Sequence, residues 1–96
     1  MNKNVTRKIN EIKETVNCFF ANADVEENNV VLVNKNDEDN VIVFERGFNY
    51  YWSNNNGLAI HIGDIENKID IPVSNVEEDE CDLDTLYLDN YMLTVL

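Results

Sequence analysis

Residues 30–62, VVLVNKNDEDNVIVFERGFNYYWSNNNGLAIHI, decide the fold class of this chain. The stretch consists of short runs of β-branched and aromatic residues that alternate with polar tracts, a pattern typical of consecutive β-strands. The Asn-rich tract at 54–57 predicts a turn, because Asn and Gly tolerate a positive φ. The runs that we expect to form strands lie at 30–33, 41–44, 48–53 and 58–62.

The strand pattern continues towards the C-terminus with less regularity. Alternating apolar residues at 69–73 predict a fifth strand, and Pro72 indicates that this strand lies at a sheet edge. We therefore expect an antiparallel meander over residues 30–73. Residues 76–96 predict an acidic loop followed by a hairpin that turns at residues 89–90, although a short helix fits the spacing of the same apolar residues.

The N-terminal segment has the periodicity of an amphipathic helix over residues 1–22. Such a helix must bury its apolar face, and an antiparallel sheet offers a surface for it. The chain is thus predicted to be a single α+β domain, residues 1–96, in which the helix packs on an antiparallel meander of about five to six strands. The apolar positions of the helix are Val5, Ile9, Ile12, Val16 and Phe19.

The chain carries a large excess of negative charge. Its 96 residues contain 19 Asp and Glu against 7 Lys and Arg, which gives a formal charge of -12. Residues 1–13 hold four cations and Glu11, a net +3, so the remaining residues carry -15 with only Lys35, Arg46 and Lys68 as cations. A surface of this sign repels phosphate groups, which argues against direct binding to nucleic acid or to anionic membranes.

Six carboxylates fall within eight positions of the C-terminal part, and three more adjoin one another earlier in the chain. Eight extended residues span ~26 Å, so six charges recur every ~4 Å, close to the phosphate spacing of ~3.4 Å along one strand of B-DNA. We expect this surface to occupy the phosphate channel of a basic protein, the alternative being a solvated acidic loop that aids solubility. The carboxylates predicted to bind a partner are Glu77, Glu78, Asp79, Glu80, Asp82, Asp84, Asp37, Glu38 and Asp39.

Aromatic residues gather in the third predicted strand. Because neighbouring residues of a strand point to opposite faces, Tyr51 and Trp52 cannot both face a core beneath the helix. Exposed Tyr and Trp are typical hot-spot residues of protein interfaces, so both are added to the predicted partner-binding residues. The alternative is that the C-terminal hairpin covers the second face. Stacking of single-stranded bases is not expected, because Arg46 is the only cation in this sequence neighbourhood.

Residue types that support catalysis or metal binding are scarce. His61 is the only histidine, and it alternates onto the polar face of its strand, where exposure or packing between strands is expected rather than catalysis. Cys18 and Cys81 lie too far apart for a zinc motif or a CxxC pair and are expected to be free thiols. The acidic stretch from Glu80 lacks the glycine and the terminal glutamate of an EF-hand loop. We therefore expect no enzymatic activity, no cofactor and no specific metal site.

In size and acidity the chain resembles the small anti-defence proteins of phages, among them anti-CRISPR proteins and other DNA mimics. This resemblance implies a non-enzymatic inhibitor that blocks the DNA or RNA channel of a nuclease or CRISPR effector. An immunity protein or antitoxin against a basic nuclease toxin needs the same charge, and a structural protein that forms a homodimer or larger homo-oligomer is a third alternative. The lack of a signal peptide and of a long apolar segment predicts a cytoplasmic protein.

Overall fold

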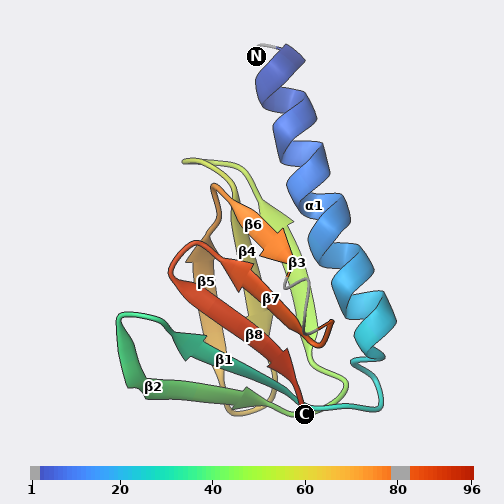
Figure 1. The fold of residues 1–96 in the computed structure, drawn as a ribbon, viewed down its shortest axis with the longest axis vertical. Helices are drawn as coiled ribbons and strands as arrows, with labels where there is room; N and C mark the ends of the chain where they lie inside the picture. Colours follow the sequence, from blue (N-terminus) through green and yellow to red (C-terminus); the bar gives the residue numbers. More distant parts are fainter. Residues whose placement is uncertain (1–2, 79–82) are drawn as a thin grey trace.

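A computed structural model of the chain describes residues 3–78 and 83–96. Within these residues a long helix precedes eight antiparallel strands, so the predicted α+β class is confirmed (Figure 1). The elements are α1 (Lys3–Ala23), β1 (Val30–Asn34), β2 (Asp37–Phe44), β3 (Asn49–Ser53), β4 (Ala59–Gly63), β5 (Lys68–Pro72), β6 (Val76–Glu78), β7 (Thr85–Leu88) and β8 (Tyr91–Val95).

The strands divide between two sheets instead of forming one meander. A five-stranded sheet has the order β2-β1-β8-β7-β6, and a three-stranded sheet has the order β3-β4-β5. The C-terminal hairpin joins the first sheet, because its strand β8 pairs with β1 from Val30 opposite Val95 to Asn34 opposite Tyr91. β2 lies at the edge of this sheet, because β3 pairs with β4 in the second sheet and not with β2. The prediction that Pro72 marks an edge strand is confirmed, because β5 is an outer strand.

Two strand boundaries differ from the sequence prediction. The first hairpin turns tightly, so that most of the polar tract at 34–40 belongs to the strands. Its register shifts between Val33, which lies opposite Val41, and Asn34, which lies opposite Asp37. The shift is absorbed by a bulge, a device that inserts extra residues into one strand. The stretch predicted as an acidic loop also contains the short strand β6, which pairs with β7.

The C-terminal segment forms the predicted hairpin and not the alternative helix. β7 and β8 pair with Leu88 opposite Tyr91, so residues 89–90 make a two-residue turn. Asp89 adopts a positive φ of 49°, which Asp tolerates better than most residues. A second positive φ, 51° at Asp24, ends α1, and the Asn28 side chain donates a hydrogen bond of 2.8 Å to the Ala23 carbonyl oxygen there.

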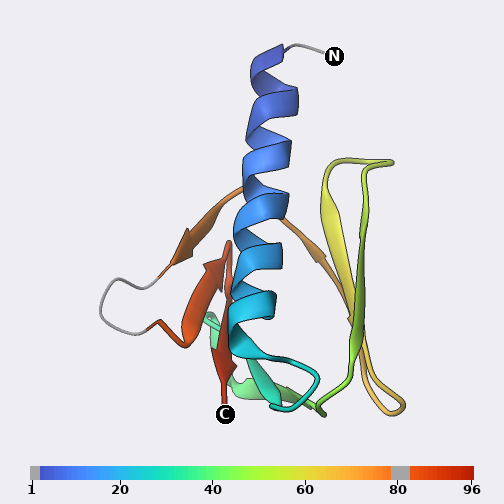
Figure 2. The same cartoon turned by 90° about the vertical axis from the view of Figure 1, so that its right-hand side faces the viewer.

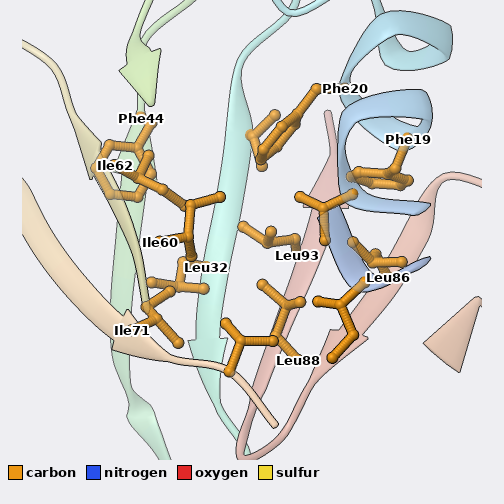
Figure 3. Close-up of a cluster of buried hydrophobic side chains, with 14 of the residues drawn as sticks. Phe19, Phe20, Leu32, Phe44, Ile60, Ile62, Ile71, Leu86, Leu88 and Leu93 are labelled. Atoms are coloured by element: carbon orange, nitrogen blue, oxygen red, sulfur yellow. The ribbon is translucent and has the colours of Figure 1, made fainter. Parts of the chain in front are cut away.

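The core lies where α1 meets the inner faces of both sheets (Figure 3). Phe20 of α1 is fully buried and makes ring contacts with Phe48 and Tyr50, with centroid separations of 5.6 and 4.5 Å. The buried side chains that the strands contribute include Leu32, Phe44, Ile60, Ile62, Ile71, Leu86, Leu88 and Leu93.

The helix runs between the two sheets and then projects beyond them (Figure 2). Its buried residues begin at Ile12, whereas Val5 is 48% exposed on the same apolar stripe. The N-terminal turns therefore carry their positive charges away from the acidic body. Within the described ranges, no helix combines the length and the apolar character that crossing a membrane needs.

Candidate functional site

The C-terminal acidic tract begins on the edge strand β6. Glu77 and Glu78 are exposed there, and Asp84 is exposed just before β7 begins. Asp79, Glu80 and Asp82 lie outside the described residues. The described ends of the predicted tract thus lie on the edge strand β6 and directly before its neighbour β7.

The second group of carboxylates lies at the opposite edge of the same sheet. Asp37, Glu38 and Asp39 are exposed at the start of β2, which is the other outer strand. Three strands separate β2 from β6, so the two edges lie ~19 Å apart at the usual strand spacing of ~4.8 Å. The fold therefore does not merge the two predicted groups into one cluster.

A row of side chains on the outer face of the sheet connects these two acidic edges. Directly paired residues share a face, and the register gives the continuous row Val41, Val33, Met92, Tyr87 and Glu77. None of these residues belongs to the core, and Val41 is 47% exposed. The outer face thus has an apolar centre with carboxylates at both ends.

The two glutamates of β6 point to opposite sides of the sheet. Glu77 lies opposite Tyr87, on the outer face. Glu78 lies opposite Leu86, whose side chain is buried in the core, so Glu78 belongs to the side that faces α1. Of these two glutamates, only Glu77 is placed to contact a partner on the outer face.

The described carboxylates of β2 and β6 form no ion pair with a basic side chain of the described residues. Between the residues that the structure describes, the one ion pair within 4 Å joins His61 and Asp70. Lys35, the cation nearest the acidic hairpin in sequence, instead donates a hydrogen bond to the Asp89 carbonyl oxygen at 3.0 Å and lies 4.6 Å from the centre of the Tyr87 ring. Within the described ranges, Asp37, Glu38, Asp39 and Glu77 are therefore exposed carboxylates with no Lys or Arg nitrogen within 4 Å.

Tyr51 and Trp52 take different positions, as the strand periodicity requires. Tyr51 is 64% exposed on the outer face of the three-stranded sheet. Trp52 packs against the core, and its indole N–H donates a hydrogen bond of 3.3 Å to the Asn17 side chain of α1. Only Tyr51 of this pair presents its ring to solvent, and it lies on a different sheet from the acidic edges.

A chain of polar contacts, which sequence reasoning missed, crosses the outer face of the three-stranded sheet. His61 contacts the Asp70 carboxylate through Nδ1 and the Ser53 hydroxyl through Nε2, the latter at 2.9 Å. The Tyr51 ring stacks on His61 with the ring centres 4.5 Å apart. Tyr51, His61 and Asp70 are direct cross-strand partners, so a correct register of β3, β4 and β5 would have revealed the contact.

The side-chain contacts run from the Ser53 hydroxyl to His61 and from His61 to the Asp70 carboxylate, as in the triad of a serine hydrolase. A surface hollow of about 450 Å³ adjoins His61 and Asp70, but Ser53 is not among its lining residues. A molecule held in this hollow would meet the imidazole and not the serine hydroxyl.

Metal-binding and thiol chemistry add no second site. No group of three or more His, Cys, Asp or Glu side chains is arranged to hold a metal ion in the described part of the chain. Cys18 is an exposed free thiol on α1, and Cys81 lies outside the described residues.

A scan against protein-family models, a search of curated proteins and a search of solved structures each found no match to this chain.

Proposed function

We propose that the protein is a non-enzymatic inhibitor that binds a basic nucleic-acid-binding protein and blocks its DNA or RNA channel. The partner is a nuclease or a CRISPR effector in the cytoplasm of a bacterial host, and the inhibitor acts as an anti-defence protein. It contacts neither nucleic acid nor membrane itself.

The observation that carries the proposal is the uncompensated acidic surface. A net charge of -12 on 96 residues destabilises the folded state by self-repulsion, and no Lys or Arg ion pair within 4 Å offsets it among the described residues. A protein that needed only solubility would reach it with a smaller and mixed set of charges. Carboxylates held at both edges of one sheet instead offer a partner two separated lines of negative charge.

The outer face of the five-stranded sheet is the contact surface that best suits this function. Interfaces usually combine an apolar centre with a polar rim. Here Val33, Val41 and Met92 supply apolar side chains, and Glu77 with the acidic start of β2 supplies the rim. The charges steer the encounter with a basic channel, and the apolar row excludes water once contact is made.

The test begins with a pull-down of tagged protein from a bacterial lysate that contains the defence systems of that bacterium. Washes at low and moderate salt are followed by mass spectrometry, and each recovered protein is purified for a DNA- or RNA-binding competition assay. We expect one nucleic-acid-binding effector, released by salt, whose nucleic-acid binding falls in proportion to added inhibitor. A partner that binds its nucleic acid equally well in the complex would refute the blocking mechanism.

Recovery of the tagged protein alone has a different meaning. It would favour the homo-oligomer alternative, which sedimentation equilibrium measures directly. A complex stabilised by apolar contacts between copies should resist moderate salt, whereas a charge-mimicry complex should weaken steeply with ionic strength.

A further inference from the structure

The hollow beside His61 lies between two connections that are distant in sequence. One wall is the link from β2 to β3, which includes Arg46, and the other is the turn from β4 to β5 with the start of β5, which includes Lys68. Tyr51, His61 and Asp70 line it from the outer face of the three-stranded sheet. Its volume of about 450 Å³ falls within the range of ~300–1,000 Å³ that is common for small-molecule sites.

Two of the three cations of residues 14–96 line this one hollow. Neither Arg46 nor Lys68 has a carboxylate oxygen within 4 Å in the described ranges, although Asp64 and Asp70 line the same hollow. Asp64 and Asp70 form no ion pair with these cations, because both carboxylates contact other groups. Asp70 contacts His61, and Asp64 accepts hydrogen bonds from the backbone N–H groups at positions 45, 66 and 67.

Those backbone contacts hold Asp64 in its ionised form. Because the N–H groups of Glu45 and Asn67 are hydrogen-bonded to its carboxylate, the pKa of Asp64 lies below its ordinary value of 3.8. The hydrogen bonds of Asp64 are thus made with the turn backbone, and its negative charge remains at the hollow without an ion pair to Arg46 or Lys68 in the described residues.

The position of Lys68 depends on the absence of a side chain at Gly63. Gly63 lies directly opposite Lys68, and a Cβ atom placed there would lie 3.1 Å from the Lys68 Cγ atom. The lysine stem therefore lies against the glycine backbone. A methyl group at this position would require the Lys68 side chain to shift by a few tenths of an ångström.

Tyr51 and His61 give the hollow a flat aromatic wall. Their rings are stacked with an interplanar angle of 16°, and Tyr51 remains largely exposed. Planar aromatic groups stack on exposed aromatic side chains in a manner that tolerates different rings. Sequence reasoning set base stacking aside because Arg46 was the only cation near Tyr51 along the chain. The fold adds Lys68 from another strand to the same hollow.

We propose that this hollow binds a small molecule in which a flat aromatic ring is joined to an anionic group, with nucleoside monophosphates as the representative class. The ring stacks on Tyr51, and the anionic group lies between Arg46 and Lys68, which form charge-assisted hydrogen bonds with it. Glu45, Asp64 and Asp70, which also line the hollow, oppose the anion. This inference is independent of the proposed inhibition of a partner protein, because it uses a different sheet.

The test is a titration of the isotopically labelled protein with adenosine monophosphate, adenosine and inorganic phosphate, followed by NMR. We expect the monophosphate to bind more tightly than either fragment and to shift the resonances of Tyr51, His61 and Lys68. Lys68→Gln and Arg46→Gln should each weaken binding about tenfold or more, since a hydrogen bond to a charged group is lost. Lys35→Gln makes the same change of charge away from the hollow and should leave the affinity unchanged.

Three further variants separate the parts of the site. Tyr51→Leu should weaken the monophosphate and adenosine but not phosphate, Gly63→Ala should weaken the monophosphate by displacing Lys68, and Glu45→Gln should strengthen it. Equal loss of affinity in Lys35→Gln and Lys68→Gln would overturn the proposal, because it would reduce the effect to net charge. No shift at the hollow with millimolar monophosphate, in protein shown to be folded by the same spectra, would overturn it as well.

Discussion

His61 lies directly opposite Asp70 on neighbouring strands, and the two side chains are joined from Nδ1 to Oδ1. An ionised carboxylate can only accept hydrogen bonds, so the proton of the neutral imidazole must sit on Nδ1. Nε2 is then the acceptor for the Ser53 hydroxyl at 2.9 Å. We expect neutral His61 to be mainly the Nδ1–H tautomer.

Long-range ¹H–¹⁵N NMR of the imidazole ring measures this tautomer. Asp70→Asn should reduce the Nδ1–H population, because an amide can accept or donate and no longer fixes the proton. Ser53→Ala serves as the matched control, since it leaves the Asp70 contact in place. A predominant Nε2–H form in the unaltered protein would show that the contact with Asp70 does not hold in solution.

Glu77 and Glu78 should differ in their effect on partner binding although they are adjacent. Glu77→Lys reverses a charge on the outer face at the end of the apolar row, whereas Glu78→Lys makes the same change on the side facing α1. We expect Glu77→Lys to weaken the complex at least tenfold and Glu78→Lys to change it less than threefold, as measured by surface plasmon resonance. Equal effects of the two variants would mean that only net charge matters and that the outer face is not the contact surface.

Much of the fold follows from local patterns that the sequence displays openly. The helix from Lys3 to Ala23, the turn at 89–90 and the edge position of Pro72 each depend on spacing or turn chemistry within a short segment. The division into two sheets could not be predicted in this way. It arises because β3 pairs with β4 and not with β2, while β8 joins β1 from about 60 positions away in the sequence, and local periodicity contains no information about such partners.

The same limit applies to the candidate sites. Strand periodicity predicts that Tyr51 and Trp52 face opposite sides of the sheet, but it does not tell which of the two is exposed. The contact of His61 with Asp70 requires the register of β4 with β5, and the placement of Arg46 and Lys68 beside one hollow requires the arrangement of the β2–β3 link relative to β5. From the sequence we expected the two acidic groups to form one surface. The order of strands in the five-stranded sheet instead places the described carboxylates of β2 and β6 at opposite edges.

Asp64 should make stability depend on pH in the acidic range. Its pKa is lowered in the folded state by hydrogen bonds from backbone N–H groups, first those of Glu45 and Asn67. Its stabilising effect is therefore fully present above the unfolded value near pH 4 and is lost as the pH falls through the lower folded value. We expect Asp64→Asn to show a smaller loss of stability between pH 5 and pH 2 than the unaltered protein, in urea denaturation followed by circular dichroism.

The control for this experiment is Glu66→Gln in the same turn. Glu66 is exposed, and its backbone N–H, not its carboxylate, contacts Asp64. It should therefore keep the pH dependence of the unaltered protein. If Asp64→Asn loses stability as steeply as this control, the turn carboxylate does not contribute to acid sensitivity.

A negative charge should unfold the protein at one valine of α1 and have little effect on its stability at another. Val16 is fully buried, and a carboxylate there costs several kcal/mol, comparable to the ~5–15 kcal/mol stability of a typical small domain. Val5 lies on the projecting turns near the helix N-terminus, where a negative charge is favourable. We expect Val16→Asp to lose its folded circular dichroism spectrum and Val5→Asp to change the unfolding free energy by less than about 0.5 kcal/mol. A folded Val16→Asp variant would contradict the docking of α1 between the sheets.

Asp89 should stabilise the C-terminal half in two separable ways. Its carboxylate accepts hydrogen bonds from the backbone N–H groups of Ser74 and Asn75 at 3.1 and 2.8 Å, which ties the turn between β7 and β8 to the segment before β6. Its positive φ of 49° is costly for most other residues. Asp89→Ala loses the hydrogen bonds and adds backbone strain, so we expect about 2–3 kcal/mol of destabilisation in urea titrations. Asp89→Gly loses the same hydrogen bonds without the strain and should be more stable than the alanine variant by about 1 kcal/mol, whereas an alanine variant as stable as the glycine one would mean that the positive φ is relaxed in solution.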